Sequence, residues 1–445
     1  MTGDARKVPA GRLARLGAFG QLAAGVAGGV VAAGARRLAA GERPRMADLL
    51  LTPANAVRVT DQLARLRGAA MKLGQMISLD AGDLLPPELT QILARLRESG
   101  STMPPAQLEK VLTQAWGLGW RRKFRRFDAR PLAAASIGQV HRAELPDGRV
   151  LAIKVQYPGV ARSIDADVDN VATLLKVSGL LPAGLDIAPL LAEAKLQLHE
   201  EADYLREAAQ MTRYADLLAD DARFVVPRPL LELTGPNVLA MDFIDARPID
   251  LLDSAPQGVR DRAMQALLEL VLRELFVFGF MQTDPNFANY RWQPDSGTIV
   301  ALDFGAARSV PPQVQQGYAA LLSAGFHGDA AGVRAALIEV GFMSAAQFER
   351  HGPALDRIIA VILEQIDRAD DFDFADRSFV DRIRAEIPEI AQDRASWHVP
   401  PAEALFVQRK ISGTVLLAVR LAAHMPLKAM VAPYAGQAVG HTDND

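Results

Sequence analysis

The 445-residue chain contains no cysteine. This absence excludes a disulfide scaffold, a thiol nucleophile, a cysteine-ligated zinc site and an iron–sulfur cluster. The net charge is only −3, so the composition gives no support for a general nucleic-acid binder. Half of the residues are hydrophobic and 23% are charged, which is ordinary for a packed globular protein. A chain of this length holds two or three domains, or one large two-lobed domain.

A strongly apolar membrane-spanning segment is also lacking. We expect no secretory signal, and the long apolar run at 16–35 consists mostly of alanine and glycine. Twenty residues could span a bilayer, and Gly25 with Gly29 forms a GxxxG pair. However, the insertion free energy of such a helix is poor because leucine, isoleucine and phenylalanine are few. We therefore favour a glycine-rich packing helix or an interfacial segment, with a spanning helix as the alternative.

The most informative stretch is 281–308, MQTDPNFANYRWQPDSGTIVALDFGAAR. Asp284 precedes Asn289 by five residues and precedes Asp303, the start of an Asp-Phe-Gly triplet, by nineteen. Protein kinases use this order because one aspartate must lie beside the attacking group, while the asparagine and second aspartate hold Mg²⁺ against the triphosphate. We predict those roles for the three residues. A lone Asp-Phe-Gly triplet would be weak support, but the combined spacing is much more specific.

A strand-rich segment upstream has the layout of a kinase N-lobe. A turn at 146–148 separates two expected strands, and the second, at 150–155, carries Lys154 in the sequence LAIK. A lysine on a rigid strand can pair with the α- and β-phosphate oxygens of a nucleotide. The alternative, a solvated lysine at a strand end, is weakened by the apolar neighbours.

Two further strands are expected at 230–233 and 238–244. They lead into a hinge that we place near Met241 to Asp245. Met241 and Ile244 are therefore candidate contacts for the nucleotide.

The expected phosphate-binding loop departs from the protein kinase pattern. Where a protein kinase has G-x-G-x-x-G, this chain has Ala133, Ala134, Ala135 and Ser136. Alanine is small enough for close approach of the backbone, but it does not readily adopt the positive φ angles that glycine allows. We expect a stiffer loop that holds the nucleotide in a different pose.

Acidic residues gather on a helix expected at about 188–218. They are Glu200, Glu201, Asp203 and Glu207. A kinase-like site needs one acid to pair with the strand lysine. Periodicity alone does not identify it, and a solvated acidic face is the alternative. A separate helical stretch carries Met71-Lys72-Leu73-Gly74-Gln75, which by itself indicates only a polar helix face.

With these pieces in place, the sequence resembles the UbiB family of atypical kinases, also called aarF-domain kinases, which are linked to ubiquinone (coenzyme Q) biosynthesis. The match covers nearly the whole chain, and the residues of its motifs are most similar to those of the mitochondrial-type branch. The motifs that carry the resemblance are Lys72-x-Gly74-Gln75, Ala133 to Ser136, Lys154, Glu201-x-Asp203 with Glu207, Asp284 to Asn289, and Asp303-Phe304-Gly305.

The resemblance implies an α+β, protein kinase-like two-lobed fold that binds ATP and Mg²⁺. It implies a helical extension at 1–115 with the K-x-G-Q motif, an N-lobe at 116–245 and a mostly helical C-lobe at 246–445. Lys72 and Gln75 would face Glu201 and Asp203 and play a regulatory part, which leaves Glu207 as the better partner for Lys154. Phosphorylation of proteins in trans would be blocked, and ATP hydrolysis would be favoured.

The resemblance also suggests partners: ATP, a lipid or ubiquinone precursor, an anionic membrane surface and other ubiquinone biosynthesis proteins, with a homodimer left open and no nucleic acid. We expect a cytoplasmic protein, peripheral at the inner membrane if the source is bacterial. Gln282-Thr283 replaces the His-Arg of protein kinases, so regulation by a phosphorylated activation loop is not expected. The rival hypotheses are a nucleotide- or lipid-binding pseudokinase scaffold and a small-molecule kinase, although the latter would not explain the K-x-G-Q extension.

Overall fold

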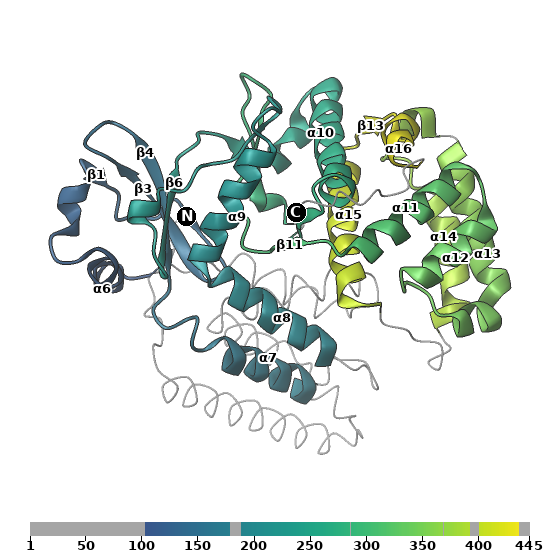
Figure 1. The fold of residues 1–445 in the computed structure, drawn as a ribbon, viewed down its shortest axis with the longest axis horizontal. Helices are drawn as coiled ribbons and strands as arrows, with labels where there is room; N and C mark the ends of the chain where they lie inside the picture. Colours follow the sequence, from purple (N-terminus) through teal and green to yellow (C-terminus); the bar gives the residue numbers. More distant parts are fainter. Residues whose placement is uncertain (1–102, 179–187, 285, 368, 392–399, 436–445) are drawn as a thin grey trace, which may run out of the picture. The chain divides into compact units, whose positions relative to one another are not determined.

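The structure is a computed structural model that describes residues 103–178, 188–284, 286–367, 369–391 and 400–435 (Figure 1). The chain divides into two compact units. The N-unit comprises Met1–Arg213 with Pro227–Ile244, and the C-unit comprises Tyr214–Val226 with Asp245–Asp445. The K-x-G-Q motif, with Lys72 and Gln75, lies outside the described residues, as does the apolar run at 16–35.

The N-unit is built on an antiparallel sheet in the order β1-β3-β4-β6, with β2 also paired to β3. Its strands are β1 (Arg126–Phe127), β2 (Ala133–Ala134), β3 (Gly138–Glu144), β4 (Val150–Gln156) and β6 (Val238–Asp242). β4 lies between two partners, so Val140 of β3 and Leu239 of β6 flank Lys154 on either side. This central position holds the backbone of the lysine through ladder hydrogen bonds on both edges.

The N-unit helices are α6 (Pro105–Trp116), η2 (Trp120–Lys123), α7 (Ile164–Ser178), α8 (Ala188–Glu201), α9 (Tyr204–Leu217) and η3 (Leu231–Leu233); α9 continues into the C-unit from Tyr214. Two expectations are corrected. The single helix expected at 188–218 is two helices, because Asp203 ends one run and its side chain caps the next by accepting from the Arg206 backbone N–H at 3.0 Å. The strand expected at 230–233 is instead the 3₁₀ turn η3, which places Thr234 to bond Leu230 and Ala240.

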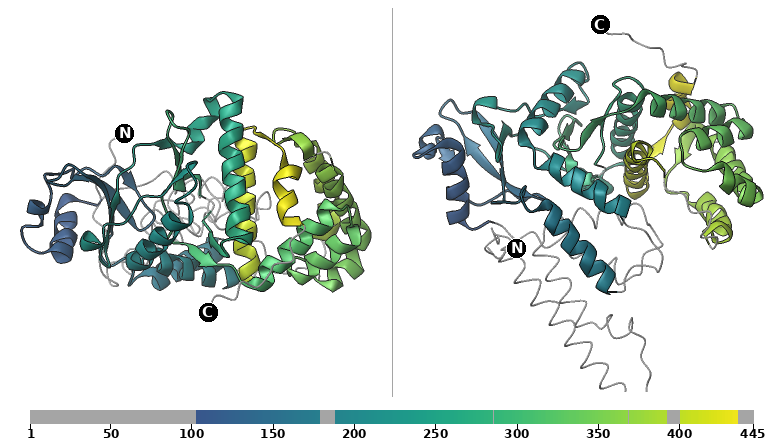
Figure 2. Two further views of the ribbon diagram at one scale, coloured as in Figure 1. Left: turned by 45° about the horizontal axis from the view of Figure 1, so that its top comes forward. Right: turned by 60° about the horizontal axis from the view of Figure 1, so that its bottom comes forward.

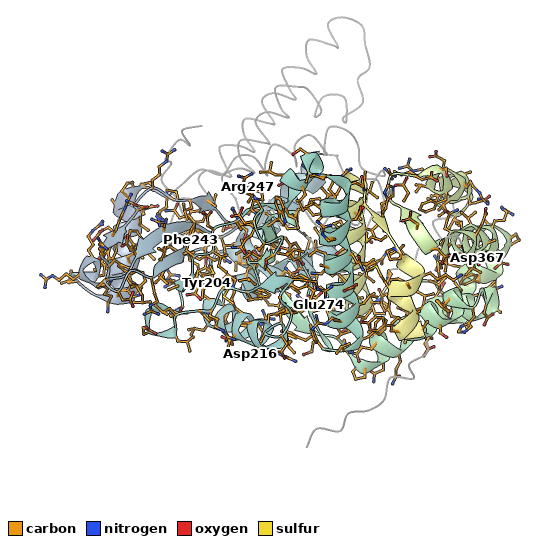
Figure 3. The ribbon with its side chains drawn as sticks, turned by 90° about the horizontal axis from the view of Figure 1, so that it is seen from above. Tyr204, Asp216, Phe243, Arg247, Glu274 and Asp367 are labelled. Atoms are coloured by element: carbon orange, nitrogen blue, oxygen red, sulfur yellow. The ribbon has the colours of Figure 1, made fainter. Side chains whose placement is uncertain are left out.

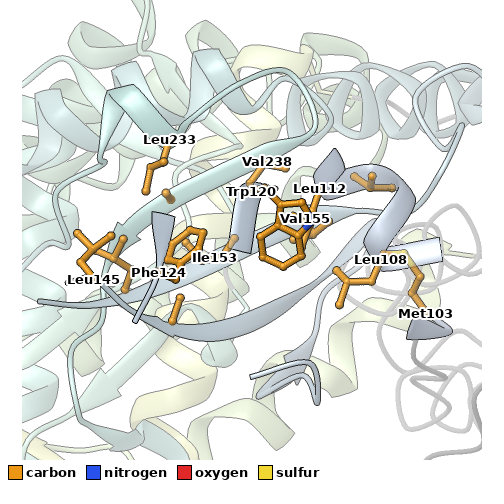
Figure 4. Close-up of a cluster of buried hydrophobic side chains, with 14 of the residues drawn as sticks. Met103, Leu108, Leu112, Trp120, Phe124, Leu145, Ile153, Val155, Leu233 and Val238 are labelled. Carbon is orange, nitrogen blue, oxygen red and sulfur yellow. The ribbon is translucent and has the colours of Figure 1, made fainter. Parts of the chain in front are cut away.

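The core of the N-unit lies between α6, η2 and the sheet (Figure 4). Leu112 of α6 is 0% exposed and Trp120 is 2% exposed, against Ile153 and Val155 of β4 at 0%. Trp120 also contacts Phe124 and Phe127 edge-on, at centroid distances of 6.2 and 4.9 Å. Each large apolar side chain buried here contributes roughly 1.5–3 kcal/mol, so the strand that carries Lys154 has a firm backing.

The described residues of the C-unit form three small sheets. One has the order β5-β10-β9-β7, the second pairs β11 with β8, and the third pairs β12 with β13. The strands are β5 (Phe224–Val225), β7 (Arg247–Pro248), β8 (Phe280–Gln282), β9 (Tyr290–Trp292), β10 (Ile299–Ala301), β11 (Ala307–Ser309), β12 (Phe372–Asp373) and β13 (His424–Met425). The β8–β11 pair fixes the start of the 281–308 stretch against its end, since Gln282 lies opposite Ala307.

Helices make up most of the rest of the C-unit. They are η4 (Ile249–Ser254), α10 (Gln257–Phe276), η5 (Phe287–Asn289), α11 (Pro312–Phe326), α12 (Ala330–Glu339), α13 (Ala345–Asp367), η6 (Ala369–Asp371), α14 (Ser378–Ala391), α15 (Ala402–Arg420) and α16 (Leu427–Ala435). α13 is kinked at His351, two residues before Pro353. α10 and α15 pack side by side (Figure 2). Among the described helices, none is both long and apolar enough to cross a membrane.

Candidate nucleotide and metal site

A buried ion pair joins β4 to α9 in the N-unit. The Lys154 ammonium donates to both carboxylate oxygens of Glu207, at 2.9 and 3.0 Å. The Glu207 side chain is 0% exposed and that of Lys154 is 9% exposed. The ammonium also lies 5.3 Å from the centre of the Tyr204 ring, a favourable cation–π distance. The Lys154 ammonium is therefore held in one position on the central strand, as a phosphate-binding lysine requires.

Glu207 owes its position to the start of α9. It lies in the first turn, where a carboxylate interacts favourably with the helix dipole. The backbone N–H of Glu207 donates to the Asp203 carbonyl at 2.9 Å, so the capping residue also orients the paired acid. Because the break between α8 and α9 falls at 202–203, Glu201 and Glu207 belong to different helices.

The alanine-rich segment is partly a strand. Ala133 and Ala134 form β2, opposite Val140 and Gln139, and the Ala135 backbone N–H donates to the Gly138 carbonyl at 2.9 Å. The segment at 133–138 contains no residue with a positive φ angle. A glycine is still needed at Gly138, where an added Cβ would lie 2.4 Å from the Val155 carbonyl oxygen.

The two acids of the Glu-x-Asp motif have different surroundings. Glu201 is buried and accepts a hydrogen bond from the Ser136 hydroxyl at 2.6 Å, which ties the end of α8 to the alanine-rich segment. Asp203 is exposed and caps α9. The partners implied for them, Lys72 and Gln75, lie outside the described residues. The N-unit thus contains two side-chain pairs on neighbouring elements: Lys154 with Glu207, and Ser136 with Glu201.

The proposed hinge residues lie at the end of the N-unit. Met241 is buried in β6 opposite Ala152, and Ile244 is half-buried at the last residue of the unit. The backbone N–H of Phe243 donates to the Val150 carbonyl at 3.0 Å, which extends the β4–β6 pairing beyond the strand. Their contact with a nucleotide remains a prediction.

In the C-unit the kinase-like motifs lie on short connections between strands. The Asn289 side-chain amide donates to the Asp284 carbonyl at 3.3 Å, and the Leu302 backbone N–H donates to the Asn289 carbonyl at 2.9 Å. The Thr283 hydroxyl donates to the Ala306 carbonyl at 2.6 Å. These bonds link the 284–289 connection to the residues on each side of Asp303.

Asn289 and Asp303 line one small cavity, which has room for the centre of about one water molecule (about 10 Å³). One carboxylate and one amide oxygen form a donor set that suits Mg²⁺, a hard cation that prefers oxygen and takes few protein ligands beside phosphates. The described residues hold no cluster of three or more His, Cys, Asp or Glu that could bind a metal by itself. The residues present therefore fit a metal held jointly with a nucleotide.

The phenylalanine of the Asp-Phe-Gly triplet is anchored in the C-unit core. Phe304 is 1% exposed and its ring centre lies 4.6 Å from that of Tyr214. Tyr214 also contacts Phe280 of β8 at 5.2 Å. The Gly305 backbone N–H donates to the Asp303 carboxylate at 3.0 Å, so the triplet is held by packing on one residue and by a turn on the next.

Comparison with known proteins identifies the family. A family model described as the ABC1 atypical kinase-like domain matches residues 95–337, more than half of the chain. The chain belongs to the ABC1 atypical kinase-like family. The α+β, kinase-like fold predicted from the sequence is confirmed by this match and by the structural comparison below.

Several members of the ABC1 family are similar over nearly the whole chain. The mitochondrial atypical kinase coq-8 of Caenorhabditis elegans is 38% identical over 94% of this chain and 56% of its own length. The mitochondrial atypical kinase COQ8 of Saccharomyces cerevisiae is 37% identical over 94% of this chain and 83% of its own length. The chain thus spans little more than half of the C. elegans relative. A solved structure, Rv3197 of Mycobacterium tuberculosis in complex with erythromycin, is 26% identical with a TM-score of 0.60, covering 84% of this chain and 95% of that one.

Sequence reasoning missed two buried polar residues that contact Gln282, close to the Asp284–Asn289 motif. Glu274 of α10, labelled in Figure 3, and Lys410 of α15 are 0% and 1% exposed. In the sequence both lie in helices that read as ordinary core helices, and they are 136 positions apart. No local pattern distinguishes them from residues on a solvated helix face.

Proposed function

We propose that this member of the ABC1 family is an Mg²⁺-dependent ATPase or atypical kinase that supports ubiquinone biosynthesis. The observation that carries the proposal is the buried, two-pronged ion pair between Lys154 and Glu207 on the central strand of the N-unit. Such a pair is costly to bury for stability alone, and it is the arrangement that a phosphate-binding lysine needs.

The roles of the other residues follow from their chemistry. Lys154, oriented by Glu207, would neutralise the α- and β-phosphates of ATP. Asn289 and Asp303 would hold Mg²⁺, which supplies charge neutralisation on the phosphates when bound. Asp284 is half-buried and would orient the attacking group, for which we favour water over a protein hydroxyl. The segment from Ala133 to Ser136 would lie over the phosphates, with Met241 and Ile244 near the base.

We further propose contact with an anionic membrane surface and a lipid-like partner. The support is the resemblance to the ubiquinone-linked branch and the similarity to the COQ8 relatives. Phosphate release from ATP should therefore be measured with and without anionic liposomes. No phosphate release under either condition, with Mg²⁺–ATP still bound, would favour the pseudokinase scaffold.

The decisive test is nucleotide-dependent thermal stabilisation. Mg²⁺–ATP at about 100 times its Kd should stabilise the wild type by about 2.7 kcal/mol. Asp303→Asn should abolish the part of this effect that depends on Mg²⁺, because it removes the charged ligand. Asp295→Asn, at an exposed carboxylate in the turn between β9 and β10, is the matched control and should respond as the wild type does.

Full stabilisation of Asp303→Asn would contradict the metal assignment. The biological half of the proposal is tested by growth of a ubiquinone-deficient host. Wild type and Asp295→Asn should restore growth, whereas Asp303→Asn should not.

A further inference from the structure

One lysine of α15 reaches into the interior of the C-unit. Lys410 is 1% exposed, and its ammonium donates to the Gln282 side-chain oxygen at 3.0 Å and to the Tyr290 hydroxyl at 2.5 Å. Its counter-charge is Glu274 of α10, whose Oε2 lies 3.5 Å away. The other oxygen of Glu274 accepts from the Tyr214 hydroxyl at 2.8 Å and from the Gln282 backbone N–H at 3.2 Å. Five polar side chains thus form one buried network.

Stability alone is a weak reason for such a network. Ions are costly to bury, and well-packed apolar residues in their place are often at least as stabilising. Burial disfavours the ammonium form of Lys410, yet Glu274 and Tyr290 together raise its pKa, so the lysine stays charged. A charged, hydrogen-bonded lysine holds its partners in defined directions, which an apolar side chain cannot do.

The partners of Lys410 lie at the two ends of the proposed catalytic segment. Gln282 is two residues before Asp284, and Tyr290 directly follows Asn289. The Lys410 ammonium therefore bonds side chains that flank residues 284–289 on both sides.

The network also borders the metal pair. Glu274, Gln282 and Tyr290 line the same small cavity as Asn289 and Asp303. Glu274 Oε2 and Gln282 Nε2 are buried atoms without a hydrogen-bond partner in the described part of the chain. A shift of the network would reach the Asn289 side of the cavity directly.

We propose that Lys410 is a positioning residue that sets the distance between Asp284 and the metal-binding residue Asn289. The inference rests on the proposed function, because it concerns the alignment of those groups. Lys410 itself would contact neither substrate nor metal; it acts through Gln282 and Tyr290. Through Lys410, helix α15 then supports the proposed catalytic segment from a distance of more than a hundred residues in the sequence.

The test uses the double variant Lys410→Met/Glu274→Gln in the full chain, which removes both charges and leaves no lone buried ion. We expect it to unfold cooperatively, with kcat for Mg²⁺–ATP hydrolysis lowered by about 10- to 100-fold, the size expected for misplacement by about 1 Å. The KM for ATP should change by less than about threefold, because Lys154 and the N-unit are untouched. The Mg²⁺ concentration for half-maximal rate should rise.

Two single variants accompany it. Arg420→Met removes a half-exposed charge from the same helix, where Arg420 lies 3.4 Å from Asp250, and should leave kcat and Mg²⁺ dependence unchanged. Tyr290→Phe removes only one hydroxyl of the network and should give an intermediate fall in kcat with unchanged KM. It carries the test by itself if the double variant does not fold.

The outcomes separate the inference from the function on which it rests. A wild type that neither binds nor hydrolyses Mg²⁺–ATP overturns the proposed function, and this inference with it. An active wild type together with folded variants of unchanged kcat and Mg²⁺ dependence overturns the positioning role alone.

Discussion

Replacement of Glu207 by glutamine is the sharpest perturbation of the N-unit. The substitution keeps the shape of the side chain but removes the charge that balances Lys154, and both residues are almost fully buried. Removing one partner of a buried ion pair costs about 3–5 kcal/mol, because the other charge remains without compensation. The amide oxygen can still accept one of the two bonds at 2.9 and 3.0 Å, which retains about 1 kcal/mol. The free energy of unfolding should therefore fall by about 2–4 kcal/mol.

Urea unfolding followed by tryptophan fluorescence measures this loss, since Trp116 and Trp120 lie in the N-unit core. The control is Glu109→Gln at the exposed pair with Arg121, whose side chains are 47% and 58% exposed, where we expect a change within about 1 kcal/mol. Lys154→Met and the double variant complete a thermodynamic cycle, and the coupling energy should be a large part of the single-variant loss. A loss from Glu207→Gln no greater than that of the control would refute the reasoning.

Two further perturbations test separate features. Hydrogen bonds and charge from Arg223, together with the charge of Arg273, lower the pKa of Asp221 from its usual 3.8 to about 2. The contribution of the Asp221 carboxylate to stability is therefore complete above pH 4 and is lost as the pH falls towards 2. Asp221→Asn should cost about 1–2 kcal/mol at pH 7, after allowance for solvent screening, and this difference should vanish near pH 2 in unfolding curves taken across the pH range. Ala134→Gly should loosen β2 and change the ratio of the ATP and ADP affinities measured by calorimetry, whereas unchanged affinities for both would remove the argument from stiffness.

Local patterns were enough to predict the strand that carries Lys154. Apolar residues, a tight turn at 146–148 and a second apolar run determine a hairpin whatever surrounds it. The structure places β3 and β4 there, with Lys154 opposite Val140. The order of the motifs and their resemblance to one family then supplied the kinase-like fold, which the family match confirms.

The break between α8 and α9 could not be predicted from local sequence patterns. Residues 188–218 contain strong helix formers and no glycine, and the only proline is at the start, so propensity favours one continuous helix. Asp203 ends the run because its side chain is better used as a cap for α9, a preference that only the packed structure decides. The consequence reaches the site, since the break gives Glu201 and Glu207 separate directions and separate partners, Ser136 and Lys154.

The Ser136–Glu201 bond changes the physical account of the alanine-rich segment. The sequence alone predicts a stiff segment because glycine, with its positive φ angles, is absent from residues 133–136. In the structure the segment is held at both ends, by pairing of Ala133 and Ala134 with β3 and by the Ser136 hydroxyl on the buried Glu201. A hydrogen bond to a charged acceptor contributes about 1.5–3 kcal/mol, more than the cost of about 0.5–1 kcal/mol for a glycine in a strand. The Glu-x-Asp motif is thus the stronger restraint on the proposed phosphate-binding segment, and a change in the partners of Glu201 would be transmitted to it through Ser136.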